Sequence, residues 1–187
     1  MVIKRLKLNN FRCFEHLTID FEEDINVIVA ENGRGKSAIL DAIAIVFSPY
    51  LRNFNGAQIR DFNAYDAYQS EAEKTGNKVR IPRVKKKYPV SIEMLGVFAG
   101  QPIKCKRELK QEGDNTNDRQ VAALRKYGEK LQKAVHGAHD EQVVLPVIAY
   151  YGTTRLWQEG RAVIAEPSLV NLERDSGYFE AWEPPAT

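Results

Sequence analysis

Alternating apolar and polar positions over the first thirty residues predict β-structure. Leu6 and Leu8 alternate with polar neighbours and are followed by the polar pair 9–10, so we expect a strand that ends there in a turn. The alternation over 17–21 predicts a second, half-buried strand. Residues 25–29 are nearly continuous in apolar, mostly β-branched side chains, which is typical of a strand buried on both faces.

A helix is predicted directly after a glycine-containing loop. Apolar side chains cover most of the circumference of the segment from Lys36 to Phe47, so we expect this helix to be buried between layers. Pro49 is expected to end it, because proline cannot continue a helix.

Shorter patterns predict the remaining elements and divide the chain into parts. The first part, 1–52, contains the strands, the loop and the helix described above. The later parts are a polar insertion over 53–89 with a short helix near 64–74, a β-hairpin over 90–110, a helix over 118–136 that Asp118 caps, and a buried strand with its following loop over 143–157.

Composition is that of a globular chain with no membrane-spanning segment. The 187 residues are 43% hydrophobic and 28% charged, and the formal net charge is +2. The two cysteines cannot build a disulfide framework, which favours a reducing compartment. The N-terminus lacks a long apolar stretch, so we expect no signal peptide and a cytoplasmic location.

The small net charge hides a concentrated basic block. Residues 78–110 carry a net charge of +8, whereas 1–77 carry −2 and 111–187 carry −4. Such a block suggests a phosphate-rich partner and hence nucleic acid, although a solvated strand face would have the same composition. The candidate contacts are Lys85, Lys86, Lys87, Lys104, Lys106 and Arg107.

The loop at 30–37 has the composition of a phosphate-binding loop. It reads Ala-Glu-Asn-Gly-Arg-Gly-Lys-Ser and stands between a predicted strand and a predicted helix. Its glycines allow successive backbone N–H groups to surround a phosphate, Lys36 would reach the β- and γ-phosphates, and Ser37 would ligate Mg²⁺. Ala30 replaces the first glycine of the usual pattern, and the alternative is a glycine-rich turn that only joins two elements.

These motifs resemble those of the SMC and RecF-type ATPases, a branch of the ABC-class P-loop proteins. The resemblance is carried by Leu-Asn-Asn-Phe-Arg at 8–12, Asn-Gly-Arg-Gly-Lys-Ser at 32–37 and Ile-Leu-Asp-Ala-Ile at 39–43. It implies an α/β fold, a P-loop NTPase lobe with a mixed β-sheet core around the P-loop helix plus an antiparallel β-subdomain. It also implies ATP and Mg²⁺ as cofactors and nucleotide contacts from Arg12, Asn32, Gly33, Arg34, Gly35, Lys36, Ser37 and Ala38. The alternative for Arg12 is an ion pair with an acidic neighbour such as Glu15.

Within the family, the segment at 147–157 is similar to the PtuA-like ATPases of the Septu and retron anti-phage systems. It reads Val-Ile-Ala-Tyr-Tyr-Gly-Thr-Thr-Arg-Leu-Trp, at the place where the family contacts Mg²⁺ and the γ-phosphate. The family's glutamine is not at the strand end, so Gln158 is a second candidate Mg²⁺ ligand and Arg155 an alternative to it. The aromatic residues of this segment would otherwise belong to the hydrophobic core.

The chain lacks the catalytic elements that the family uses. No apolar strand ends in Asp-Glu and no Ser-Gly-Gly stretch occurs, so we identify no catalytic residue in this chain. His136 and His139 could ligate a metal, but further ligands are missing. We therefore expect residues 1–187 to be the N-terminal lobe of an ATPase head, incompetent alone and active when a C-terminal lobe completes it.

The resemblance implies a function in nucleic-acid handling. Such heads dimerise head to tail on ATP, and this one would couple its nucleotide state to nucleic acid or to a partner nuclease, in anti-phage defence or DNA repair. The alternative is a nucleotide-binding scaffold that assembles a nuclease or nucleoprotein complex without hydrolysis. A different P-loop enzyme, such as a kinase, fits the motif at 8–12 less well.

Overall fold

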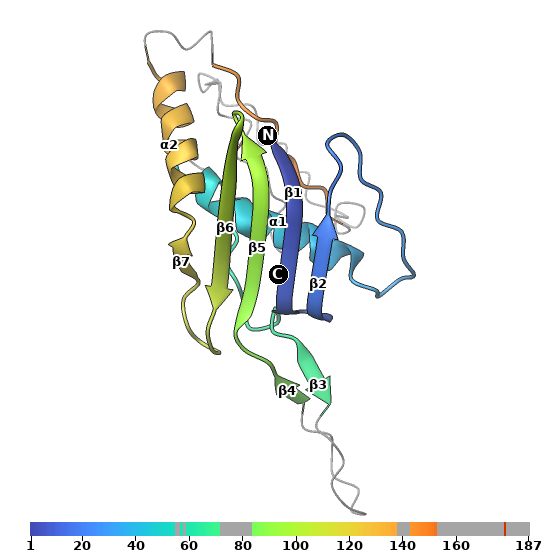
Figure 1. Ribbon diagram of the computed structural model, residues 1–187. Coiled ribbons are helices and arrows are strands. Elements are labelled where there is room, and N and C mark those ends of the chain that lie inside the picture. The colour runs from blue at the N-terminus through green and yellow to red at the C-terminus, as the bar shows by residue number, and fades with distance from the viewer. Residues whose placement is uncertain (55–56, 58, 72–83, 138–142, 153–177, 179–187) are drawn as a thin grey trace, which may run out of the picture.

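The computed structural model describes residues 1–54, 57, 59–71, 84–137, 143–152 and 178, and its centre is a five-stranded antiparallel sheet (Figure 1). The elements are β1 Val2–Phe11, β2 Phe14–Asp20, α1 Lys36–Leu51, β3 Gln69–Glu71, β4 Val84–Lys86, β5 Val90–Phe98, β6 Gln101–Leu109, β7 Asn117–Gln120 and α2 Ala122–Val135. The sheet has the order β2-β1-β5-β6-β7, with α1 crossing one face and α2 beside β6. The predicted α/β class and antiparallel β-subdomain are confirmed.

Strand β1 is longer than its sequence pattern predicted. It pairs with β2 up to Phe11 and Phe14, so the turn lies at 12–13 and not at 9–10. Asn10 stays inside the strand with a φ of 50°, a left-handed conformation that asparagine tolerates better than most residues. The next hairpin, β5–β6, forms within the predicted range and pairs along its whole length.

Helix α1 continues through its proline, so the predicted end at Pro49 is wrong. Proline lacks the N–H that would bond to the carbonyl of Ile45, four residues earlier. Arg107 of β6 supplies a replacement, because its Nη1 lies 2.7 Å from the Ile45 oxygen. The helix therefore runs to Leu51 with that carbonyl satisfied from the sheet.

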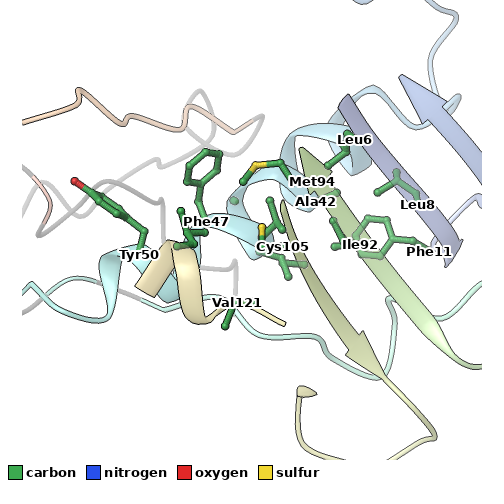
Figure 2. Close-up of a cluster of buried hydrophobic side chains, with 14 of the residues drawn as sticks. Leu6, Leu8, Phe11, Ala42, Phe47, Tyr50, Ile92, Met94, Cys105 and Val121 are labelled. Carbon is green, nitrogen blue, oxygen red and sulfur yellow. The ribbon is translucent and has the colours of Figure 1, made fainter. Parts of the chain in front are cut away.

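The hydrophobic core lies between α1 and the sheet (Figure 2). Buried residues alternate with more exposed residues along β5 and β6, as expected for a sheet with one covered face, although the outer face of β5 also has the apolar Leu95 and Val97. The buried side chains include Leu6, Leu8 and Phe11 of β1, Ile92 and Met94 of β5, Cys105 of β6, and Ala42, Phe47 and Tyr50 of α1.

The predicted short helix near 64–74 is wrong. The described part of this range contains a turn and then β3, which pairs with β4 as a small hairpin below the main sheet (Figure 1). Polar side chains bond to the backbone in the turn: Asn63 accepts from the N–H of Tyr65 at 2.8 Å, and Asp66 accepts from that of Asn63 at 2.9 Å. These bonds compete with a helical backbone and favour the turn.

Helix α2 begins later than predicted. Asp118, the predicted cap, lies in β7, where its carboxylate accepts a hydrogen bond from Nε of Arg107 at 2.7 Å. A Cβ on Gly128 would stand 2.6 Å from the carbonyl oxygen of Tyr50, so this glycine lets α2 approach α1 closely. No helix of the described residues is both long and apolar enough to cross a membrane.

Two segments predicted as buried strands are not strands. Residues 25–29 and the described part of 143–157 pair with no other strand of the described chain. Leu145, Ile148 and Tyr150 pack against the core, whereas Val144, Val147, Ala149 and Tyr151 are exposed. A continuous β-branched run forms a buried strand only where other strands flank it, and the described residues supply none. The large apolar side chains left exposed here are Ile25, Val27, Val29, Val144, Val147 and Tyr151.

Candidate nucleotide-binding site

Two glycines of the loop before α1 adopt left-handed backbone conformations. Gly33 and Gly35 have φ values of 81° and 88°, which residues with a Cβ rarely adopt. A Cβ on Gly35 would lie 2.5 Å from both Sγ of Cys13 and Cζ of Phe14, whereas one on Gly33 would meet no atom within 4 Å. Gly35 is therefore packed against the β1–β2 turn, and Gly33 borders open space.

The side chain of Lys36 folds back over this loop. Its Nζ donates hydrogen bonds to the carbonyl oxygens of Ala30 at 2.6 Å and Glu31 at 2.9 Å. Both acceptors belong to the loop, so the ammonium group remains over it instead of extending into solvent.

The start of α1 favours an anion. In the described chain, no side chain caps the helix at Gly35, and the first turn contains no acidic residue. The unpaired N–H groups of this turn and the helix dipole both attract negative charge. Ser37 is exposed in the same turn, and its hydroxyl oxygen is a ligand type that Mg²⁺ accepts.

The other predicted loop contacts surround this position. Asn32 and Arg34 are exposed, and Arg34 pairs with Glu31 at 3.3 Å. Ala38 is buried against the core, so it could offer a nucleotide only its backbone. The loop, Lys36 and Ser37 together fit a nucleoside triphosphate with Mg²⁺. The loop amides and Lys36 would hold the phosphates, and Ser37 would hold the metal. The individual contacts stay predictions.

Arg12 lies in the β1–β2 turn beside the loop, and its guanidinium is already paired. Nε donates to Oδ1 of Asp66 at 2.8 Å, and Nη1 donates to Oδ2 of Asp41. Burial alone would lower the pKa of Arg12, but Asp66 and Asp41 outweigh it and raise that pKa. The suggested partner Glu15 instead accepts from Lys87 at 2.7 Å. A contact between Arg12 and nucleotide stays a prediction.

Sequence reasoning missed the cluster around Asp41. Its Oδ1 accepts hydrogen bonds from the hydroxyl of Tyr150 at 2.7 Å and from Nη1 of Arg60 at 2.8 Å. Its other oxygen, Oδ2, accepts the bond from Arg12. The guanidinium of Arg60 also lies 4.5 Å above the Tyr150 ring. The available signal was a single carboxylate within the apolar run of α1. Tyr150, for which the sequence suggested either core or site, packs against the core and bonds to this carboxylate.

Arg107 is wrong as a nucleic-acid contact, because its side chain is completely buried. It donates to the carbonyl oxygens of Ile45 and Arg60 and to the carboxylates of Asp61 and Asp118. The alternation in β6 contained the signal: position 107 has the same parity as the buried residues 103, 105 and 109.

The remaining basic candidates are exposed or half-buried, and most are paired. Lys86 pairs with Glu112, and Lys87 pairs with Glu15. Lys85 on β4 is exposed. On the outer face of β6, Lys104 lies 3.8 Å from Glu93, and Lys106 lies 2.8 Å from Glu108. Within the described part of the basic block, four of these five lysines thus have an acidic partner, and binding of the block to nucleic acid stays a prediction.

Other candidates fall outside the described residues. These are Gln158, Arg155, Trp157, His139 and the Asp-Glu pair at 140–141. Within the residues that the structure does describe, no group of three or more His, Cys, Asp or Glu side chains could hold a metal ion.

The chain matches a known protein family over most of its length. Residues 5–181 match the family described as AAA domain. The chain belongs to this AAA domain family. The match begins within β1 and includes the phosphate loop, α1 and α2. Relatives include SMC, RecN, RecF and Rad50 proteins, which confirms the SMC and RecF-type resemblance.

Two curated relatives illustrate the similarity. The chain is 29% identical to the DNA repair protein RecN of Bacillus subtilis (strain 168), over 77% of this chain and 24% of RecN. It is 36% identical to the structural maintenance of chromosomes protein 6B of Arabidopsis thaliana, over 44% of this chain and 8% of that protein. The chain thus spans at most 24% of the length of these relatives.

A solved structure from work on the structural biochemistry of ATP-driven dimerization and DNA stimulated activation of SMC ATPases is also similar. It is 20% identical, with a TM-score of 0.44, and the match covers 78% of this chain and 87% of that one. A score this low adds nothing to the assignment that the family match provides.

Proposed function

We propose that this chain is the ATP-binding lobe of an SMC/RecF-like ATPase head. The observation that carries the proposal is the phosphate loop, in which two left-handed glycines lead into an uncapped helix start and Lys36 folds over the loop carbonyls. Lys36 and the loop amides would bind the phosphates, and Ser37 would bind Mg²⁺, which neutralises phosphate charge.

Catalysis would require groups from a C-terminal lobe. The sequence contains no apolar strand ending in Asp-Glu to hold Mg²⁺ and orient the attacking water. The exposed apolar side chains of 25–29 and 143–147 support a further layer over these segments, because large apolar patches usually mark an interface. In this proposal the C-terminal lobe covers them and completes the sheet.

The completed heads would dimerise head to tail around ATP and handle nucleic acid in the bacterial cytoplasm. Relatives named for DNA repair, such as RecN and the Rad50 ATPases, support a role in DNA repair. Control of a partner nuclease in anti-phage defence is the narrower form of the proposal, and it rests on the segment beginning at Val147.

A second candidate is a scaffold that binds nucleotide without turnover. The missing Asp-Glu element favours it, because a phosphate loop alone binds but does not hydrolyse ATP.

Nucleotide binding and turnover, measured on this chain alone and on this chain together with the proposed C-terminal lobe, test these proposals. We expect both to bind ATP, this chain alone to hydrolyse it at the background rate, and the combination to turn it over. Rapid hydrolysis by this chain alone would contradict a missing catalytic group, and no turnover by the combination would favour the scaffold. Failure of both to bind ATP would refute both functions.

A further inference from the structure

A single carboxylate on α1 joins three other segments of the chain. Oδ1 of Asp41 accepts from Tyr150 at 2.7 Å and from Arg60 at 2.8 Å, while Oδ2 accepts from Arg12. Arg12 is in turn held by Asp66 at 2.8 Å, and the Asp66 side chain is completely buried. Asp41 therefore fixes α1 to the β1–β2 turn, to the chain near residue 60 and to the segment 143–152.

Asp41 lies close to the predicted Mg²⁺ ligand Ser37 along α1. Asp41 follows Ser37 by four residues, so the two side chains lie one turn apart on the same face of the helix. The Asp41 side chain is only 14% exposed, and Tyr150 packs against the core. Ion pairs and a hydrogen bond to a shielded carboxylate define geometry more strictly than exposed pairs do.

Tyr150 is the neutral partner in this cluster. Burial and the hydrogen bond to Asp41 raise the pKa of its phenol, so the hydroxyl remains protonated and donates to the carboxylate at neutral pH. The other two partners of Asp41, Arg12 and Arg60, are cations. Because the Tyr150 hydroxyl is neutral, removing it changes the geometry at Asp41 without changing the charge of the cluster.

We propose that Asp41 and Tyr150 are positioning residues for the magnesium ion of a bound nucleotide, acting through the helix turn that carries Ser37. The inference rests on the proposed nucleotide binding. Loop amides can follow a small shift of the phosphates, whereas Mg²⁺ requires near-ideal octahedral geometry. Loosening this turn should therefore weaken the metal's contribution to affinity before it weakens phosphate binding.

The test compares ATP affinity in the presence of Mg²⁺ and in the presence of excess EDTA. The ratio of the two dissociation constants is the magnesium gain. For Tyr150→Phe and Asp41→Asn we expect the gain to fall by about tenfold, the effect of losing a hydrogen bond to a charged group. The Kd in EDTA should stay within about twofold of the wild-type value. Tyr65→Phe removes a hydroxyl from an exposed tyrosine and should leave both constants unchanged.

A double variant and the wild type complete the design. If the two residues act through one hydrogen bond, adding Tyr150→Phe to Asp41→Asn should cause little further loss. An unchanged gain, or equal weakening with and without Mg²⁺, would overturn the inference while leaving nucleotide binding intact. A wild-type chain that binds ATP without any magnesium gain would overturn it as well. A wild-type chain that binds no ATP would overturn the proposed function and this inference together.

Discussion

The guanidinium of Arg107 donates a hydrogen bond across 2.7 Å to the carbonyl oxygen of Ile45, the helical carbonyl that Pro49 leaves without its usual partner. The same side chain reaches the carbonyl of Arg60 at 2.8 Å and the carboxylate of Asp118. One buried arginine of the sheet thus completes α1 and fixes both the chain at residue 60 and strand β7 beside it.

Replacing this arginine should be among the most destabilising changes in the lobe. Arg107→Met removes the donor to the carbonyls of Ile45 and Arg60 and leaves Asp118 with Arg52 as its remaining arginine partner. We expect this loss to lower the free energy of unfolding by about 3–5 kcal/mol. Urea denaturation measures the loss. Lys104→Met, on the exposed face of the same strand, should change it by less than about 0.5 kcal/mol. Equal unfolding curves for the two variants would contradict the role given to Arg107.

The two loop glycines should differ in their tolerance of alanine. Both have positive φ, which costs a residue with a Cβ about 1 kcal/mol. Only at Gly35 would the new Cβ also collide with Cys13 and Phe14. Gly35→Ala should therefore destabilise the fold by about 2 kcal/mol more than Gly33→Ala. Thermal unfolding of the two variants tests this, and equal losses would argue against close packing of Gly35 on the β1–β2 turn.

The two cysteines should react at very different rates. Cys13 is exposed, whereas Cys105 is buried under α1, and burial raises the pKa of the Cys105 thiol to about 12. Because the thiolate is the reactive form, iodoacetamide at pH 8 should alkylate Cys13 and spare Cys105 in the folded protein. Peptide mass spectrometry locates the label. Both should react in urea, and rapid labelling of Cys105 without urea would contradict its place in the core.

Lys85 and Lys86 of β4 and the adjacent Lys87 should contribute unequally to nucleic-acid binding, if the basic block binds it. Glu112 and Glu15 offset Lys86 and Lys87, whereas Lys85 is exposed. Replacing all three by Gln should weaken DNA or RNA binding and flatten its salt dependence, and Lys85→Gln alone should account for most of the change.

A matched control for this triple variant is available on α2. Lys126, Lys130 and Lys133 are exposed, and replacing them by Gln removes the same charge from another face. Fluorescence anisotropy with a labelled oligonucleotide at several salt concentrations separates the two sets. Equal effects from both would show that only net charge matters.

The predictions from sequence succeeded where a pattern is satisfied locally. The β5–β6 hairpin and the start of α1 at Lys36 follow from alternation and from a glycine-rich turn, which neighbouring residues decide. They failed where a distant partner decides. Pro49 stays helical because Arg107 replaces its missing donor. Ile25, Val27 and Val29 lie exposed because no described strand pairs with this segment.

The sequence likewise identified only the local part of the candidate site. The phosphate loop is contiguous in the sequence, so its spacing alone identified it. The Asp41 cluster joins four segments that are distant in the sequence. Nothing in the sequence indicates that Asp66 pairs with Arg12 or that Tyr150 bonds to Asp41. Arg107 shows the opposite error, since its charge suggested a surface role and its strand register placed it inside.

The most direct test of the account is ATP binding by the Lys36→Ala variant, measured by isothermal titration calorimetry beside the wild type. Lys130→Ala on the exposed surface of α2 is the matched control, and thermal unfolding confirms that both variants fold. Lys36 donates only to loop carbonyls in the described structure, so its loss should spare the fold and remove the ammonium that would meet the phosphates. We expect ATP binding to be lost in Lys36→Ala and retained in Lys130→Ala. Wild-type affinity in a folded Lys36→Ala variant would contradict it.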